Sequence, residues 1–211
     1  MLIERNKIYC MDCLEGMKQI EDKSIDLILT DPPYGVDKEG IANDKTLWAY
    51  ELNYKRVLKN SGVLIIFTST KYLKKVLNLI NLPYKWQFIW YCSNNMIAGG
   101  MGFAKYTSAL IFSEGNIFRN AQDCREYPAG TNELKNINHP TPKPTKIIRY
   151  LLEKYSEEDE LVLDPFMGSG TTAVACKQLN RNFIGFEINQ EYVDIANKRL
   201  AQETLQSKEW F

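Results

Sequence analysis

Short apolar runs alternate along the chain with longer amphipathic segments. The apolar runs, rich in β-branched and aromatic residues, predict seven strands, at residues 7–11, 25–30, 62–67, 84–92, 106–112, 161–163 and 182–186. Apolar residues at every third or fourth position predict helices at residues 13–20, 46–59, 71–81, 145–155, 171–179 and 190–201. This alternation is typical of an α/β fold whose mostly parallel sheet is covered by helices on both faces.

Two parts of the chain depart from the alternation. No helical pattern separates the expected strands 84–92 and 106–112, so we expect them to form an antiparallel hairpin at one edge of the sheet. Residues 113–138 are mainly polar and turn-forming, without a clear period. An irregular segment of this length is uncommon in a compact domain and is often functional.

Length and composition fit one domain. The 211 residues, 45% of them apolar, are enough for a single hydrophobic core, so we expect residues 1–211 to form one domain. No run approaches the roughly 20 apolar residues of a membrane span, and the first residues lack the layout of a secretory signal. We therefore expect a soluble, cytoplasmic protein without a membrane partner.

The cysteines do not indicate a disulfide framework or a metal site. Five of them, an odd number, are scattered over a chain with no export signal, so reduced thiols are expected. Cys10 and Cys13 form a C-x-x-C motif, but no second pair and no nearby histidine completes a zinc site. We expect no metal.

The charges are balanced overall but unevenly distributed. Lysine plus arginine and aspartate plus glutamate both total 26, so net charge neither favours nor opposes a nucleic-acid partner. Residues 135–149 contain Lys135, Lys143, Lys146 and Arg149 and no acid. Such a stretch is either a basic face for nucleic acid or an ordinary solvated helix face.

The expected strand 25–30 ends in the tetrapeptide Asp31-Pro32-Pro33-Tyr34. A continuous apolar run indicates a buried parallel strand, and ligands bind at the carboxyl edge of such sheets. The two prolines fix two φ angles and remove two donors, so the turn presents a carboxylate, a carbonyl and an aromatic ring at set spacing. The alternative is an ordinary turn, in which proline and aspartate are common.

These three groups suit an amino group attached to an aromatic base. Such a nitrogen is a poor nucleophile because its lone pair is delocalised into the ring. If Asp31 and the Pro32 carbonyl each accept one N–H bond, the nitrogen moves toward tetrahedral geometry and its lone pair can face a methyl donor. Tyr34 would stack on the base after the base is flipped out of the duplex.

A second motif follows the short strand 161–163. Residues 164–172 read DPFMGSGTT before a predicted helix, so Gly168 and Gly170 allow close backbone approach and the helix start supplies N–H groups. Two glycines alone are weak evidence. Glu187, however, lies 19 residues after Gly168 at a strand end, where an acid binds the ribose of an adenosine cofactor. The alternative for Glu187 is a cap for the next helix.

As a pair, the two motifs resemble those of the DNA amino-methyltransferases. The catalytic tetrapeptide precedes the cofactor loop, as in the circularly permuted β class of that family, and the resemblance extends from Ile8 to Leu200. It implies a Rossmann-like, doubly wound sheet, S-adenosyl-L-methionine as cofactor and DNA as partner. Because aspartate at the first position of the tetrapeptide favours adenine in that family, it also implies methylation of adenine N6. The family often dimerises, so a homodimer is expected as well.

The resemblance also implies roles for individual residues. Asp31, Pro32, Pro33 and Tyr34 match the catalytic motif. The expected cofactor contacts are Asp12 at the adenine, Asp164 beside the methionine, Glu187 at the ribose, Thr141 and Lys143 at the carboxylate, and Phe166, Gly168, Ser169, Gly170 and Thr171 in the loop. Pro142 stands where the family often has glutamine, and His139 is expected to fix its turn and not to act as a base.

The expected target-recognition insertion is short. Members of the family usually carry a larger region before the segment that begins at His139, whereas this chain offers only residues 113–138. Arg119, Arg125 and Lys135 are candidates for contacts to phosphate or base edges.

Several alternatives stay open on the sequence. The same chemistry would serve cytosine N4 in DNA, an RNA base or a protein glutamine amide. A nucleotide-binding oxidoreductase or an inactive binding module is a different class of protein. The missing third glycine of G-x-G-x-x-G and the intact tetrapeptide argue against both.

Overall fold

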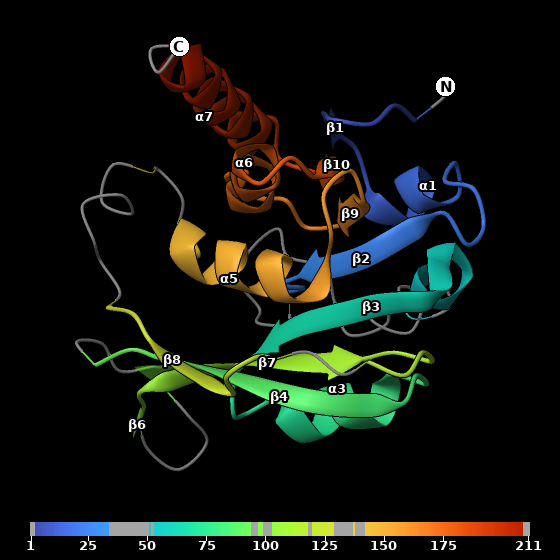
Figure 1. The fold of residues 1–211 in the computed structure, drawn as a ribbon, viewed down its shortest axis with the longest axis vertical. Coiled ribbons are helices and arrows are strands. Elements are labelled where there is room, and N and C mark those ends of the chain that lie inside the picture. The colour runs from blue at the N-terminus through green and yellow to red at the C-terminus, as the bar shows by residue number, and fades with distance from the viewer. Residues whose placement is uncertain are drawn as a thin grey trace.

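An eight-stranded sheet forms the centre of the protein, with the strand order β1-β10-β9-β2-β3-β7-β4-β8 (Figure 1). The computed structural model describes residues 3–33, 51, 53–93, 97–98, 103–117, 120–128, 137 and 142–208. The strands of this sheet are β1 (Lys7–Cys10), β2 (Ile25–Thr30), β3 (Leu58–Thr68), β4 (Tyr84–Tyr91), β7 (Tyr106–Phe112), β8 (Cys124–Glu126), β9 (Leu161–Asp164) and β10 (Asn182–Glu187). Two further short strands, β5 (Ile97–Ala98) and β6 (Phe103–Ala104), pair with each other.

Helices lie on both sides of this sheet. They are α1 (Cys13–Met17), α3 (Leu73–Leu79), α5 (Thr145–Tyr155), α6 (Thr171–Gln178) and α7 (Gln190–Lys208), and residues 53–57 are also helical. Buried residues of α1 and α3 belong to one core cluster, whereas those of α5 and α6 belong to a second. No helix in the described part of the chain is long and apolar enough to span a membrane.

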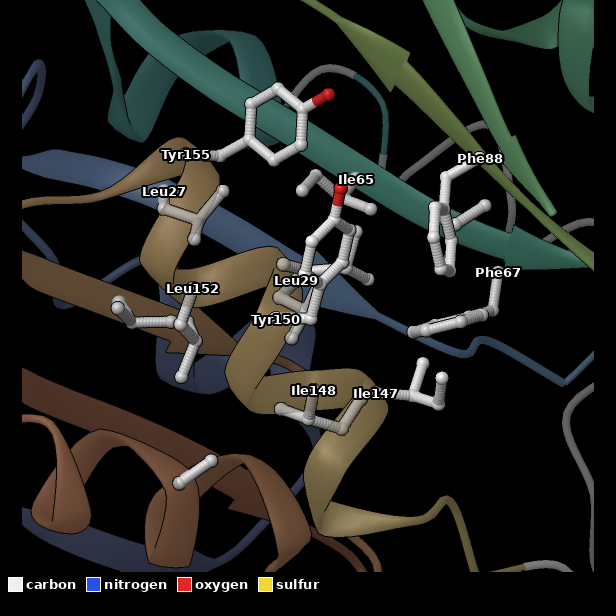
Figure 2. Packing of buried hydrophobic residues seen from close by; sticks show 14 of the residues in the cluster. Leu27, Leu29, Ile65, Phe67, Phe88, Ile147, Ile148, Tyr150, Leu152 and Tyr155 are labelled. Atoms are coloured by element: carbon white, nitrogen blue, oxygen red, sulfur yellow. The ribbon is translucent and has the colours of Figure 1, made fainter. Parts of the chain in front are cut away.

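The central strands contribute to both cores because successive side chains point to opposite faces. In β2, Ile28 lies in the cluster with α1, whereas Leu27 and Leu29 lie in the cluster with α5. Figure 2 shows side chains of α5, such as Ile147 and Tyr150, packed among Leu29 and other residues of the sheet. Burial on both faces explains the continuous apolar run that predicts this strand.

Strand directions place many carboxyl ends at one edge of the sheet. β1, β10, β9, β2 and β3 pair in parallel. β7 is antiparallel to both β3 and β4, and β8 is parallel to β4. Strands β4 and β8 therefore run in the same direction as β3, and only β7 is reversed. The α/β class and the mostly parallel sheet are confirmed.

The structure differs from the expected pattern at one edge. The antiparallel hairpin of β4 and β7 is present, but β8 extends the sheet beyond it, which gives eight strands and not seven. Strand β8 lies within residues 113–138, which were expected to be irregular. Its three residues are too few to show a period, and tertiary contacts hold them: Trp90 Nε1 donates to the Tyr127 carbonyl at 2.7 Å, and Gln122 N donates to Tyr150 Oη at 2.6 Å.

A second difference occurs where a helix was expected up to residue 59. Helical residues end at 57 and β3 begins at Leu58, four residues before the expected strand start. Leu58 pairs with Ile25 of β2, and Lys59 forms an ion pair with Asp26 at 2.5 Å. Pairing with a central strand thus overrides the local helical period. Residues 46–50 and 52 of that expected helix lie outside the described residues.

Candidate active site

Four acidic residues follow four neighbouring strands at the same edge of the sheet. Asp12, Glu187, Asp164 and Asp31 lie at or just after the carboxyl ends of β1, β10, β9 and β2, which are adjacent in that order. Ligands of open α/β sheets bind at this edge. Asp31, which begins the tetrapeptide, and the glycine-containing loop after β9 therefore lie at the ends of adjacent strands, although they are far apart in sequence.

Asp164 is the buried member of this group. Its side chain accepts hydrogen bonds from Thr172 Oγ1 at 2.6 Å and from Phe166 N at 3.1 Å, which hold the loop to the end of β9. Burial raises the pKa of the Asp164 carboxyl from 3.8 to about 7; the two hydrogen bonds oppose the shift, and the negative charges of Asp31 and Glu187 add to it. A buried carboxylate of this kind would favour a cationic group of a ligand at this point.

The loop after β9 requires its two glycines. Gly168 and Gly170 have φ angles of 53° and 82°, in the left-handed region that other residues seldom adopt. A Cβ atom on Gly170 would lie 2.6 Å from the Cβ of Ala196 in α7, so close packing also excludes a side chain there. The loop therefore turns tightly into α6, which begins at Thr171.

Glu187 contacts this loop directly. Its Oε2 accepts a hydrogen bond from Gly168 N at 2.9 Å, and its Oε1 accepts one from Asn189 N at 2.8 Å. The cap of α7 is Asn189, whose Oδ1 accepts from Glu191 N at 2.8 Å. In the structure, Asn189 therefore caps α7, and Glu187 bonds to the glycine loop.

Arg199 of α7 is a site residue that the sequence analysis missed. Its Nη1 donates to the Ser169 carbonyl at 2.7 Å and to Thr171 Oγ1 at 3.1 Å. Ser169 and Thr171, both expected cofactor contacts, are buried and bonded to this arginine. In a helix rich in charged residues, nothing in the local sequence distinguishes Arg199 from its neighbours.

Asp31 forms an ion pair that the sequence did not indicate. Lys143 Nζ donates to Asp31 Oδ2, and the same ammonium lies 5.5 Å from the centre of the Phe67 ring. The Lys143 side chain is 16% exposed and that of Asp31 36%. The structure thus pairs Lys143 with Asp31, and its expected contact with the cofactor carboxylate stays a prediction.

Asp12 caps the first helix. Its Oδ1 accepts hydrogen bonds from Leu14 N at 2.8 Å and from Glu15 N at 3.3 Å at the start of α1. The side chain is fixed and exposed at the same edge as the other acids. Its expected contact with the cofactor adenine stays a prediction.

Part of the expected site lies outside the described residues. Tyr34, Thr141, His139, Arg119 and Lys135 belong to this part. Pro32 is buried directly after β2, and Pro33 is partly buried. The five cysteines, Cys10 and Cys13 included, are free thiols, and the described residues contain no cluster of side chains suited to a metal ion.

Comparison with known proteins decides the family. A family model for N6/N4 methyltransferases, described as DNA methylase, matches residues 25–198. The chain belongs to the N6/N4 DNA methylase family. The resemblance to DNA amino-methyltransferases is thereby confirmed, and an oxidoreductase on the same sheet is not favoured.

Individual relatives agree with this assignment. The type II methyltransferase M.HpaI of Haemophilus parainfluenzae is 30% identical over 235 residues, which cover 93% of this chain and 74% of M.HpaI. M2.MboI of Moraxella bovis, also a type II methyltransferase, is 29% identical, covering 93% of this chain and 88% of its own.

Solved structures of methylases have the same fold. M1.HpyAVI in complex with SAM has a TM-score of 0.73 and 28% identity, covering 92% of this chain and 98% of that one. The cytosine-N4-specific PvuII DNA methyltransferase has a TM-score of 0.77 at 19% identity, covering 94% of this chain and 87% of that one. At this identity the PvuII enzyme supports the fold only.

The raised pKa of Asp164 predicts a pH-dependent stability. The folded state holds the proton of the Asp164 carboxyl more tightly than the unfolded state does. The stabilisation of the folded state that results is therefore fully present below pH about 4 and is lost as pH rises through about 7. Asp164→Asn keeps a neutral group there. The free energy of unfolding of the wild type minus that of the variant should therefore fall between pH 5 and 7, by up to about 1.4 kcal/mol per pH unit.

Urea titrations at pH 5, 6, 7 and 8 measure this difference. Asp194→Asn, which removes an exposed carboxylate of α7, is the control for the loss of a carboxylate outside the site. A constant difference for Asp164→Asn would contradict the buried, protonated carboxyl.

Proposed function

We propose that this methylase transfers a methyl group from S-adenosyl-L-methionine to N6 of adenine in DNA. The observation that carries the proposal is the position of Asp31 after β2, a strand that pairs directly with β9, at whose end the glycine loop begins. The residues assigned to the methyl donor and to the target amine thus follow adjacent strands. The aspartate at the first position of the tetrapeptide supports adenine over cytosine N4.

The residues of the chain suit the cofactor. S-adenosyl-L-methionine supplies, when bound, a methyl group made electrophilic by the positive sulfur. The buried carboxyl of Asp164 suits the cationic methionine end, and Glu187 has lone pairs left for ribose hydroxyls beside the loop. Phe166, Gly168, Gly170 and Asp12 complete the proposed contacts, with Asp12 at the adenine.

Asp31 and Pro32 act on the target nitrogen. The carboxylate of Asp31 and the carbonyl of Pro32 accept the two N–H bonds of a flipped-out adenine, so the lone pair is localised on nitrogen and faces the methyl group. As the N–C bond forms, the bond between the methyl group and the donor sulfur breaks, so positive charge passes from sulfur to nitrogen, where the negative charge of Asp31 stabilises it. The nitrogen then loses a proton to water, which leaves the methylated amine neutral. Tyr34 stacks on the base in this proposal.

Asp31→Ala tests the mechanism and the substrate together. Removing the acceptor should lower the single-turnover rate of methylation about a hundredfold to a thousandfold. Cofactor affinity should stay within about threefold, because in this proposal Asp31 does not bind the cofactor. Nucleosides from DNA treated with the wild type should contain N6-methyladenine by mass spectrometry, and the variant should serve as the blank.

Each other outcome of that experiment has a definite meaning. N4-methylcytosine without N6-methyladenine would overturn the choice of base. Labelled methyl groups found only in RNA or in protein would overturn the choice of polymer. Near-normal transfer by Asp31→Ala would remove the tetrapeptide from the mechanism.

Glu187→Ala tests the cofactor site. Loss of its hydrogen bonds to a ribose should weaken S-adenosyl-L-methionine binding about tenfold to a hundredfold in calorimetry. Glu187→Gln keeps one acceptor oxygen and should fall between the alanine variant and the wild type. Glu191→Ala, which removes an exposed acid in the first turn of α7, is the matched control. Unchanged affinity in a folded Glu187→Ala protein would show that the proposed cofactor orientation is wrong.

We also assign residues 113–138 to target recognition, together with one face of α5. Arg125 of β8 lies 4.3 Å from the centre of the Tyr150 ring, which also has Lys154 at 6.0 Å, and Lys146 lies 5.7 Å from that of Tyr127. Ion pairs within the described part of the chain use other basic residues, so these three charges are available to phosphates. The small size of this region favours a homodimer as the DNA-binding form.

Arg125→Ala should weaken DNA binding several-fold and reduce the dependence of log affinity on log salt by about 1, because one phosphate contact is lost. The control is Arg149→Ala, since Arg149 already pairs with Glu153 at 3.6 Å and bonds Gln178 at 3.5 Å. Fluorescence anisotropy over a range of salt concentrations measures both. Equal effects of the two variants would contradict the assignment.

A further inference from the structure

The ion pair between Lys143 and Asp31 uses only one oxygen of the catalytic carboxylate. Lys143 Nζ bonds Oδ2, and the Asp31 side chain makes no other hydrogen bond or ion pair among the described residues. A carboxylate can accept hydrogen bonds at both oxygens. Within this part of the chain, Oδ1 is therefore left to accept from a target amine while Oδ2 is held.

The backbone around Lys143 fixes where its side chain starts. Pro142 and Pro144 flank it, and each proline restricts its own φ and the conformation of the residue before it. Pro144 is buried and is the N-cap residue of α5, whose side chains Ile147 and Leu151 are buried in the core. The ammonium itself is mostly buried against the Phe67 ring. Lys143 is thus held at both ends.

The charges around Asp31 explain why it needs a cation. Asp164 and Glu187 follow the next two strands, and the charge of Asp31 is among those that raise the pKa of Asp164. Negative charges at one edge repel one another, and an opposite charge beside Asp31 offsets this repulsion. Among the described ion pairs, that of Lys143 is the one made to this group of acids.

On the basis of the proposed function, we propose that Lys143 is a positioning residue for methyl transfer. Its ammonium anchors Oδ2 of Asp31 and so presents Oδ1 to the amino group of the target base. Lys143 does not touch the reacting atoms. It acts through Asp31.

Three variants of Lys143 separate charge from hydrogen bonding. Lys143→Met removes both and should lower the single-turnover rate at saturating DNA and cofactor about tenfold to a hundredfold, the usual effect of removing a group that orients a functional ligand. Lys143→Gln keeps a donor without the charge and should be intermediate. Lys143→Arg keeps both and should restore most of the rate. Cofactor affinity should stay within about threefold in all three, because Lys143 acts on Asp31.

Lys59→Met is the matched control. It breaks another lysine–aspartate pair, that of Lys59 with Asp26 at 2.5 Å, which lies near the amino end of β2. It should leave the rate unchanged. Thermal unfolding of every variant separates a loss of fold from a loss of rate, and the arginine and glutamine variants keep the test open if the methionine variant unfolds.

A double-mutant cycle identifies the path of the effect. In an Asp31→Asn background, Lys143→Met should cause no further loss, because no carboxylate is left to hold. Full additivity of the two losses would overturn the positioning role.

Other outcomes also overturn the inference. A cofactor affinity lowered tenfold or more by Lys143→Met with an unchanged single-turnover rate would make Lys143 a cofactor contact. A rate that stays normal or rises would show that Lys143 does not assist, or that it competes with the target amine. In each of these cases the proposed function would still stand if the wild type were active and Asp31→Ala were impaired. If Asp31→Ala were as active as the wild type, the proposed function itself would be overturned.

Discussion

The parallel pairing of β2 with β9 is the contact on which the site depends. Leu27 lies opposite Val162 and Ile28 opposite Leu163, which joins segments more than a hundred residues apart in the chain. These residues are buried on both faces of the sheet, so their pairing is stabilised by two hydrophobic cores at once. A change that displaced either strand would separate Asp31 from the glycine loop that follows β9.

The pairing of these strands brings several acidic side chains together at the carboxyl edge of the sheet. Asp164 responds by holding a proton more tightly, Glu187 by accepting two backbone hydrogen bonds, and Asp31 by pairing with Lys143. The same acids suit a ligand with a cationic methionine end and a ribose. The acidic edge therefore suits a positively charged cofactor. The cation that the protein itself places there, Lys143, pairs with Asp31, the acid assigned to the target amine.

Helix α5 connects the parts of the site. It packs on the sheet beside β2 and β3, begins two residues after Lys143, and through Tyr150 holds Gln122 of the segment assigned to recognition (Figures 1 and 2). Helix α5 is thus connected both to Gln122 and, through Pro144, to Lys143. The helix joins these contacts because its apolar face is fixed in the core.

The sequence by itself determined the α/β class, most strand and helix positions, the two motifs and the family. These follow from periodicity and from residue types at strand ends, which are local properties of the chain. Only the tertiary structure decided that β8 extends the sheet, that β3 begins at Leu58, that Arg199 holds Ser169 and Thr171, and that Lys143 lies on Asp31. Each of these depends on partners distant in sequence, and a pairing between distant residues leaves no mark on the local pattern of a single chain.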